Sequence, residues 1–108
     1  MSFGELTPVQ LQAMLANGDS RPLLLDVRET DEYEYCHIEG SRHLPMYEIT
    51  QRLGEIDRDE ELVVICHMGM RSRQVAALLV ENGFKRVYNL RGGIHAWALE
   101  IDPALPRY

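Results

Sequence analysis

Two short, continuous apolar runs constrain the fold of this chain more than any other feature. They are PLLLDV at residues 22–27 and ELVVIC at residues 61–66. A run of this kind is typical of a strand that is buried on both faces of a parallel sheet. The chain is therefore predicted to contain a sheet that is covered on both sides.

Helical patterns alternate with these runs. Thr7-Pro8 supplies an N-cap oxygen and a first-turn proline, and Asn17-Gly18 ends the apolar spacing that follows. The clearest helix is predicted from about Ser72 to Asn82, with Gly83 as its left-handed terminator. Its apolar face is predicted to hold Val75, Leu78, Leu79 and Asn82. Weaker patterns indicate a helical turn at 31–35, a helix at 47–53, strands at 42–44 and 87–89, and a last helix after the glycine turn in RGGIHAW, residues 91–97.

Strands that alternate with helices predict an α/β fold of three layers, with a central, mostly parallel sheet and helices on both faces. The length of 108 residues and a hydrophobic content of 45% fit one compact domain spanning 1–108. Sheets of this class bind ligands beyond the carboxyl ends of their strands. Cys66 stands at one such end.

Charge and hydropathy limit the class of partner. The formal net charge is −6, which argues against nonspecific binding to nucleic acid or to anionic membranes. No apolar stretch approaches the roughly 20 residues that span a bilayer, and the first residues lack a secretion-signal pattern. We therefore expect a cytoplasmic protein, with Cys36 and Cys66 as reduced thiols.

The segment ICHMGMRS, residues 65–72, carries the chemistry. The chain must turn there from a strand into a helix, and Gly69 permits the backbone angles of that turn. Amides of the turn and of the helix start can face one point, and Arg71 can add a fork of donors for an oxyanion. Such surroundings favour the thiolate of Cys66, which is the nucleophilic form. In isolation, the same cysteine would be read as a core residue.

Three ordered blocks of the sequence resemble the single-domain rhodaneses, a family of sulfurtransferases. LLLDVRETDEYEYCHIEGSRHLP is similar to the strand end and the H-I-x-G stretch of the family, and VVICHMGMRS is similar to its active-site loop. GFKRVYNLRGGIHAW resembles the closing segment. The match covers nearly the whole chain.

The resemblance implies a rhodanese-like fold and a reaction in two halves. Cys66 would take a sulfane sulfur from thiosulfate or a persulfide, carry it as a cysteine persulfide, and pass it to a thiol acceptor, with no cofactor. The substrate-binding loop would comprise His67, Met68, Gly69, Met70, Arg71 and Ser72. Met68 and Met70 are less basic than the loop residues of relatives that prefer thiosulfate. Their apolar side chains could suit a protein persulfide or a low-molecular-weight persulfide as the alternative donor.

Two other functions remain open. Cdc25-like phosphatases and arsenate reductases share the architecture but place five residues between cysteine and arginine, whereas four residues separate Cys66 from Arg71 here. The shorter loop favours sulfur over phosphorus. Rhodanese domains also serve as noncatalytic docking modules, which commonly lack the cysteine or its loop pattern. A dedicated sulfur carrier is a further variant of the transferase.

Residues outside the loop receive structural interpretations. Asp26 and Arg28 end the first apolar strand on the same side as Cys66, and an ion pair that fixes neighbouring loops is favoured over direct catalysis. Cys36 is read as structural, with a resolving disulfide to Cys66 as the alternative. The dipeptides Cys36-His37 and Cys66-His67 lack the ligand spacing of zinc sites, so no metal is expected.

Overall fold

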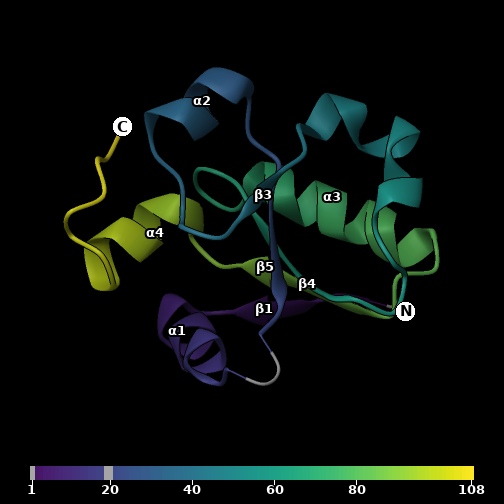
Figure 1. Ribbon diagram of the computed structural model, residues 1–108, viewed down its shortest axis with the longest axis horizontal. Helices are drawn as coiled ribbons and strands as arrows, with labels where there is room; N and C mark the ends of the chain where they lie inside the picture. Colours follow the sequence, from purple (N-terminus) through teal and green to yellow (C-terminus); the bar gives the residue numbers. More distant parts are fainter. Residues whose placement is uncertain (1, 19–20) are drawn as a thin grey trace.

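The computed structural model describes residues 2–18 and 21–108. Within these residues, five strands form one sheet in the order β1-β5-β4-β2-β3, and each neighbouring pair is parallel (Figure 1). The strands are β1 Gly4–Leu6, β2 Leu23–Asp26, β3 Arg42–His43, β4 Glu61–Ile65 and β5 Arg86–Leu90. The α-helices are α1 Pro8–Ala16, α2 Thr30–Tyr35, α3 Met70–Glu81 and α4 Gly93–Glu100, and the 3₁₀ helices are η1 Met46–Gln51 and η2 Leu53–Glu55.

The two apolar runs form the central strands β2 and β4, and both are buried on both faces. In β2, Leu25 belongs to one core cluster and Leu24 to the other. The cluster around Leu25 packs under α3, η1 and η2, and the cluster around Leu24 packs under α1 and α4. Figure 1 shows α3 and α1 on opposite sides of the sheet. The predicted three-layer α/β fold is confirmed.

Helix α3 begins two residues earlier than predicted, at Met70. Gly69 adopts φ +100°, a conformation that favours glycine, so the helix can begin immediately after it. The buried stripe of α3 also differs from the predicted face: it comprises Ser72, Val75, Ala76, Leu79 and Val80. Asn82 is exposed instead: it is the C-cap residue that follows the helix, and its side chain donates to the Leu78 carbonyl at 2.8 Å.

Other boundaries shift for local reasons. The helix expected at 47–53 is two 3₁₀ segments, η1 and η2, which meet at Arg52. The edge strand β1 was not predicted, because three residues are too few to show a periodic pattern. Strand β5 is longer than the predicted 87–89 since it pairs with both β1 and β4. In the part of the chain that the structure describes, no helix has both the length and the apolar character that crossing a membrane requires.

Candidate active site

Cys66 directly follows β4, at the edge of the sheet where the parallel strands end. The preceding residue, Ile65, pairs with Asp26, the last residue of β2. The chain leaves the sheet at Cys66, turns at Gly69 and enters α3 at Met70. Only 1% of the Cys66 residue surface is exposed. The thiol therefore lies beneath the turn and at the start of a 12-residue helix.

Two donor groups lie within hydrogen-bond distance of the Cys66 sulfur. The Gly69 backbone N–H lies 3.0 Å from Sγ, and the Ser72 hydroxyl oxygen lies 3.2 Å from it. Ser72 is fully buried in the first turn of α3, and its hydroxyl faces the Cys66 sulfur. This arrangement can stabilise negative charge on the sulfur with short, buried donors.

The first turn of α4 holds the other side of the loop. The N–H of Ile94 donates to the Cys66 carbonyl at 2.9 Å, and the N–H of His95 donates to the His67 carbonyl at 3.0 Å. Gly92 and Gly93 both have positive φ, at +77° and +63°, which lets the backbone approach the loop this closely. The predicted glycine turn therefore also anchors the candidate catalytic loop.

Arg71 is placed at the loop, but its guanidinium is already engaged. Its two terminal nitrogens donate to the Glu32 carboxylate at 2.6 and 2.9 Å. These bonds lower the pKa of Glu32 to about 2, so the pair persists at neutral pH. The predicted use of Arg71 as an oxyanion donor thus requires a ligand that competes with Glu32.

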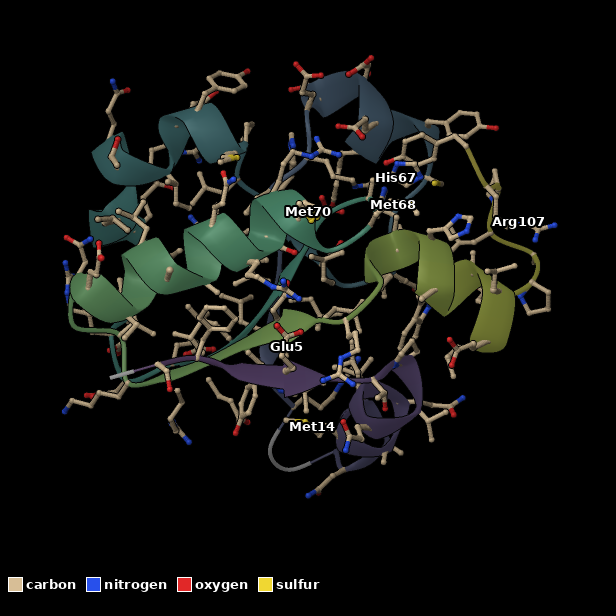
Figure 2. The ribbon with its side chains drawn as sticks, turned by 180° about the vertical axis from the view of Figure 1, so that it is seen from behind. Glu5, Met14, His67, Met68, Met70 and Arg107 are labelled. Carbon is tan, nitrogen blue, oxygen red and sulfur yellow. The ribbon has the colours of Figure 1, made fainter. Side chains whose placement is uncertain are left out.

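The exposed rim of the loop is largely apolar. Met68 is 54% exposed and Met70 is 69% exposed. Figure 2 labels both residues near His67. The His67 ring stacks on the Tyr108 ring, with centroids 3.9 Å apart and planes within 9°. A segment near the end of the described chain therefore contributes one wall beside the loop.

Asp26 and Arg28 form the expected ion pair, at 2.7 Å, and both are fully buried. Arg28 also donates to the Cys36 carbonyl at 2.6 Å and to the Tyr108 hydroxyl at 2.8 Å. Burial lowers the pKa of Arg28, but the bonds to Asp26 and to the Tyr108 hydroxyl outweigh this effect and raise it. The pair thus joins the end of β2 to α2 and to the segment at Tyr108.

Both cysteines are free thiols, and they lie in different core clusters. The Cys36 thiol donates to the Pro106 carbonyl at a sulfur–oxygen distance of 3.4 Å. This contact is consistent with the structural interpretation of Cys36. Across the described residues, no group of three or more His, Cys, Asp or Glu side chains is arranged to hold a metal ion.

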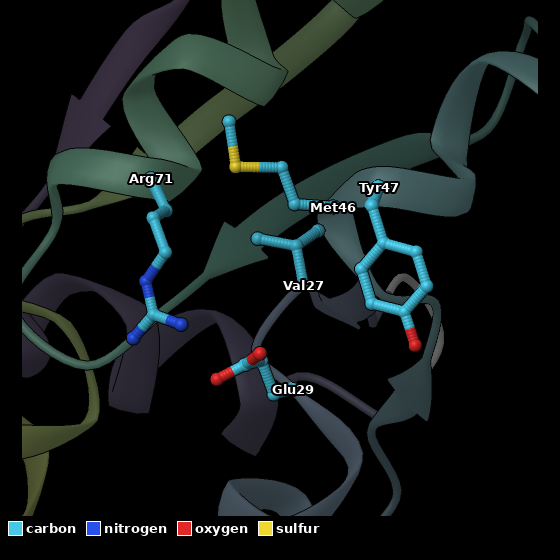
Figure 3. Close-up of a pocket in the computed structure, with 5 residues that line it drawn as sticks. All are labelled: Val27, Glu29, Met46, Tyr47 and Arg71. Atoms are coloured by element: carbon cyan, nitrogen blue, oxygen red, sulfur yellow. The ribbon is translucent and has the colours of Figure 1, made fainter.

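A pocket of about 450 Å³ adjoins the loop through Arg71 (Figure 3). Val27 and Met46 supply apolar surface, and Figure 3 shows Arg71 and Tyr47 on opposite sides with Glu29 between them. Val27 belongs to the same core cluster as Cys66, and Met46 packs against that cluster. A group with an apolar body fits this space beside Arg71.

Three residues near the loop were not predicted: Glu32, Asn89 and Tyr108. Glu32 lies on the acidic turn of α2, 39 positions from Arg71, and Tyr108 lies 76 positions beyond Glu32. Asn89 is the fully buried polar residue of β5. A polar asparagine between Tyr88 and Leu90, at the end of a predicted strand, was a usable signal, whereas nothing in the local sequence marks the other two.

Comparisons with known proteins identify the family of this chain. The family model of the rhodanese-like domain matches residues 7–100 of this chain. The thiosulfate sulfurtransferase GlpE of Glaesserella parasuis serovar 5 (strain SH0165) is 38% identical over 96 residues, which cover 89% of this chain and 87% of that protein. The GlpE of Haemophilus influenzae (strain 86-028NP) is 37% identical over 105 residues, covering 94% and 97% of the two chains.

Other relatives extend the comparison. The putative sulfur carrier protein YrkF of Bacillus subtilis (strain 168) is 40% identical over 91 residues, which cover 82% of this chain and 49% of that protein. A rhodanese-like domain protein from Staphylococcus aureus has a crystal structure similar at a TM-score of 0.84, with 26% identity over 98% of this chain and 99% of the other. The chain belongs to the rhodanese-like domain family, and it is a rhodanese-type transferase.

Proposed function

We propose that Cys66 is the nucleophile of a sulfurtransferase that takes sulfane sulfur from thiosulfate or a persulfide and delivers it to a thiol. The observation that carries this proposal is the buried sulfur at the end of β4, which two donors, Gly69 N–H and the Ser72 hydroxyl, approach. The relatives named thiosulfate sulfurtransferase and sulfur carrier protein support this class of substrate.

The first half of the reaction loads the cysteine. The Cys66 thiolate attacks the outer sulfur of thiosulfate, a new S–S bond forms, and the old S–S bond breaks with its electron pair leaving on sulfite. The product is a Cys66 persulfide whose negative charge lies on the outer sulfur. We propose that the backbone amides of residues 67–72 stabilise that negative charge.

The second half of the reaction transfers the outer sulfur from Cys66 to the acceptor. An acceptor thiolate attacks the outer sulfur, the bond to Cys66 breaks, and the thiolate of Cys66 is regenerated while the acceptor leaves as a persulfide. Charge and electrons balance without an external oxidant. We expect this transfer in the cytoplasm, where thiols stay reduced, and we assign the acceptor to small or protein thiols rather than to nucleic acid or membrane.

Two features of the site bear on the donor. Arg71 can hold a sulfonate in a bidentate pair only if the donor displaces Glu32. The exposed Met68 and Met70 and the apolar pocket beside Arg71 suit donors and acceptors with apolar bodies. We therefore include persulfides with the thiosulfate class.

Mass spectrometry of the intact protein tests the proposal. Incubation with thiosulfate is expected to add one sulfur atom to the wild-type protein and to Cys36→Ser, and none to Cys66→Ser. A gain that persists in Cys66→Ser, or no gain with thiosulfate or with an alkyl persulfide, overturns the assignment. Turnover of p-nitrophenyl phosphate or arsenate without persulfide formation would instead identify the phosphatase or reductase alternative.

A further inference from the structure

The Ser72 hydroxyl lies between two groups that both compete for its proton. Its oxygen is 3.2 Å from the Cys66 sulfur and 2.5 Å from Oδ1 of Asn89. Ser72 and Asn89 are both fully buried, so no solvent replaces a missing partner. The hydroxyl has a single proton and can donate it to only one of these neighbours at a time.

The side-chain amide of Asn89 is held in one orientation. Its Nδ2 group donates to the Glu5 carboxylate at 3.1 Å and lies 3.4 Å from the Gly69 carbonyl. Both of these groups are acceptors only. Oδ1 must therefore face Ser72, where it acts as a fixed acceptor. The other oxygen of Glu5 pairs with Arg73 Nε at 3.3 Å, so β1 and α3 together hold the arrangement.

The direction of the Ser72 proton depends on the charge of the sulfur. When Cys66 is a neutral thiol, Ser72 donates to Asn89 and accepts from the S–H group, and all groups are paired. When Cys66 is a thiolate, Ser72 must turn its proton to the sulfur, which leaves the buried Oδ1 of Asn89 facing an oxygen lone pair. In the persulfide the inner sulfur is uncharged, and Ser72 can donate to Asn89 again.

We propose that Asn89 is a positioning residue that, through Ser72, disfavours charge on the inner sulfur and thereby favours the sulfur-loaded form of Cys66. This inference rests on the function proposed above. Asn89 does not touch the sulfur. Asn89 competes with the Cys66 thiolate for the Ser72 proton. In the persulfide the charge lies on the outer sulfur, so this competition no longer destabilises the site.

Other charged or titratable groups lie on the elements around the network, and a substitution at Asn89 removes none of them. They come from the loop, from α3 and α4, from the end of β2, from α2 and from the Tyr108 segment: His67, Arg71, Arg73, His95, Asp26, Arg28, Glu32 and Tyr108. Arg71 is one cation whose charge interacts with that of Cys66. A comparison between variants therefore isolates the contribution of Asn89.

The pH dependence of alkylation tests the proposal without requiring sulfur transfer. Wild type, Asn89→Leu, Ser72→Ala and the double variant are treated with iodoacetamide across pH, and the peptide containing Cys66 is quantified by mass. Asn89→Leu frees the Ser72 proton for the sulfur, so it is expected to raise thiolate formation below the midpoint by about threefold to tenfold, a shift of roughly half to one pH unit. In the Ser72→Ala background, the same substitution is expected to have no effect.

Glu5→Ala provides a second variant in case Asn89→Leu does not fold, which thermal unfolding will report. Without Glu5 the amide can turn, so the alkylation midpoint is expected to move in the same direction by a smaller amount. At a fixed ratio of thiosulfate to sulfite, both variants are also expected to carry less persulfide than wild type. An unchanged or raised midpoint, or a shift that persists without the Ser72 hydroxyl, overturns the inference. Failure of the wild type to load sulfur overturns the proposed function instead.

Discussion

At the residue scale, the ion pair of Arg71 and Glu32 determines whether the Arg71 guanidinium can bind an anion at the loop. The pair joins the start of α3 to α2, and Glu32 also accepts a hydrogen bond from the Tyr108 hydroxyl at 2.9 Å. The Arg71 side chain is 35% exposed, whereas Glu32 is 16% exposed. The guanidinium is therefore accessible to an anion that can exchange with the carboxylate.

Glu32→Gln is expected to strengthen binding of thiosulfate. The neutral amide keeps the shape of the side chain but releases Arg71 to bind the dianion, so KM for thiosulfate should fall by about threefold to tenfold with little change in kcat. Steady-state kinetics measures the change. Glu55→Gln is the matched control, because Glu55 pairs with Arg52 at 2.8 Å outside the loop. An unchanged or higher KM in Glu32→Gln would show that Arg71 does not receive the donor.

The same carboxylate gives a pH dependence of stability. The pKa of Glu32 is lowered from 4.5 to about 2, chiefly by the hydrogen bond from Arg71. A lowered folded-state pKa stabilises the fold fully above pH 4.5, and this contribution is lost as the pH falls from there toward 2. Urea unfolding at pH 6 and pH 3 should show a larger loss in wild type than in Glu32→Gln, with a small difference because the pair is partly exposed. Equal losses would contradict the assignment.

At the scale of secondary-structure elements, the first turns of two helices enclose the loop. Helix α3 follows it and supplies Ser72, while α4 bonds to its carbonyls through Ile94 and His95. The unpaired N–H groups of a helix start normally bond to water or a ligand, and here α4 uses two of them to fix the loop. The loop geometry thus depends on an element more than 20 residues further along the chain.

Gly93→Ala is expected to disrupt both stability and activity. A Cβ at this position would collide with the carbonyl oxygens of Cys66 and His67, and φ +63° is unfavourable for alanine. The free energy of unfolding should fall by about 2 kcal/mol or more, and persulfide formation should be largely lost. Gly40→Ala is the control, because Gly40 has φ +87° with no atom near its Cβ position. The free energy of unfolding of Gly40→Ala should fall by about 1 kcal/mol, and persulfide formation should be retained. Equal losses of stability and of persulfide formation in the two variants would refute the crowding argument.

At the scale of the whole molecule, Tyr108 joins segments that are distant in sequence. Its hydroxyl donates to Glu32 at 2.9 Å and accepts from Arg28 at 2.8 Å, and its ring stacks on His67. Partial burial raises the pKa of Tyr108 to about 12, so the hydroxyl keeps its proton at neutral pH. The residue therefore ties the loop, α2 and the buried Arg28 into one unit.

Tyr108→Phe is expected to lower the free energy of unfolding by about 1 kcal/mol, because two hydrogen bonds are lost while the stacking on His67 is kept. Chemical denaturation measures this loss. Tyr47→Phe is the control, since Tyr47 is 69% exposed, and it should change stability little. If both substitutions have the same effect, the Tyr108 hydroxyl does not hold these segments together.

Several features of the fold were predictable because they depend on local patterns. The runs at 22–27 and 61–66 gave the two central strands, and Thr7-Pro8 gave the start of α1, where Thr7 and Gln10 form reciprocal cap bonds. The position of Cys66 at the carboxyl edge follows from the parallel sheet. In each case, residues close in sequence decide the outcome.

Other features depend on partners that local patterns do not contain. Whether Arg71 is free or paired depends on Glu32, the orientation of the Ser72 proton depends on Asn89 and Glu5, and the wall beside His67 comes from Tyr108. The sequence alone determined the two central strands, the main helices and the cysteine at the edge of the sheet, because hydrophobic periodicity and turn chemistry are local. Only the tertiary structure decided which charges and hydroxyls meet that cysteine, because hydrogen bonds and ion pairs act over a few ångströms in space between residues far apart in the chain.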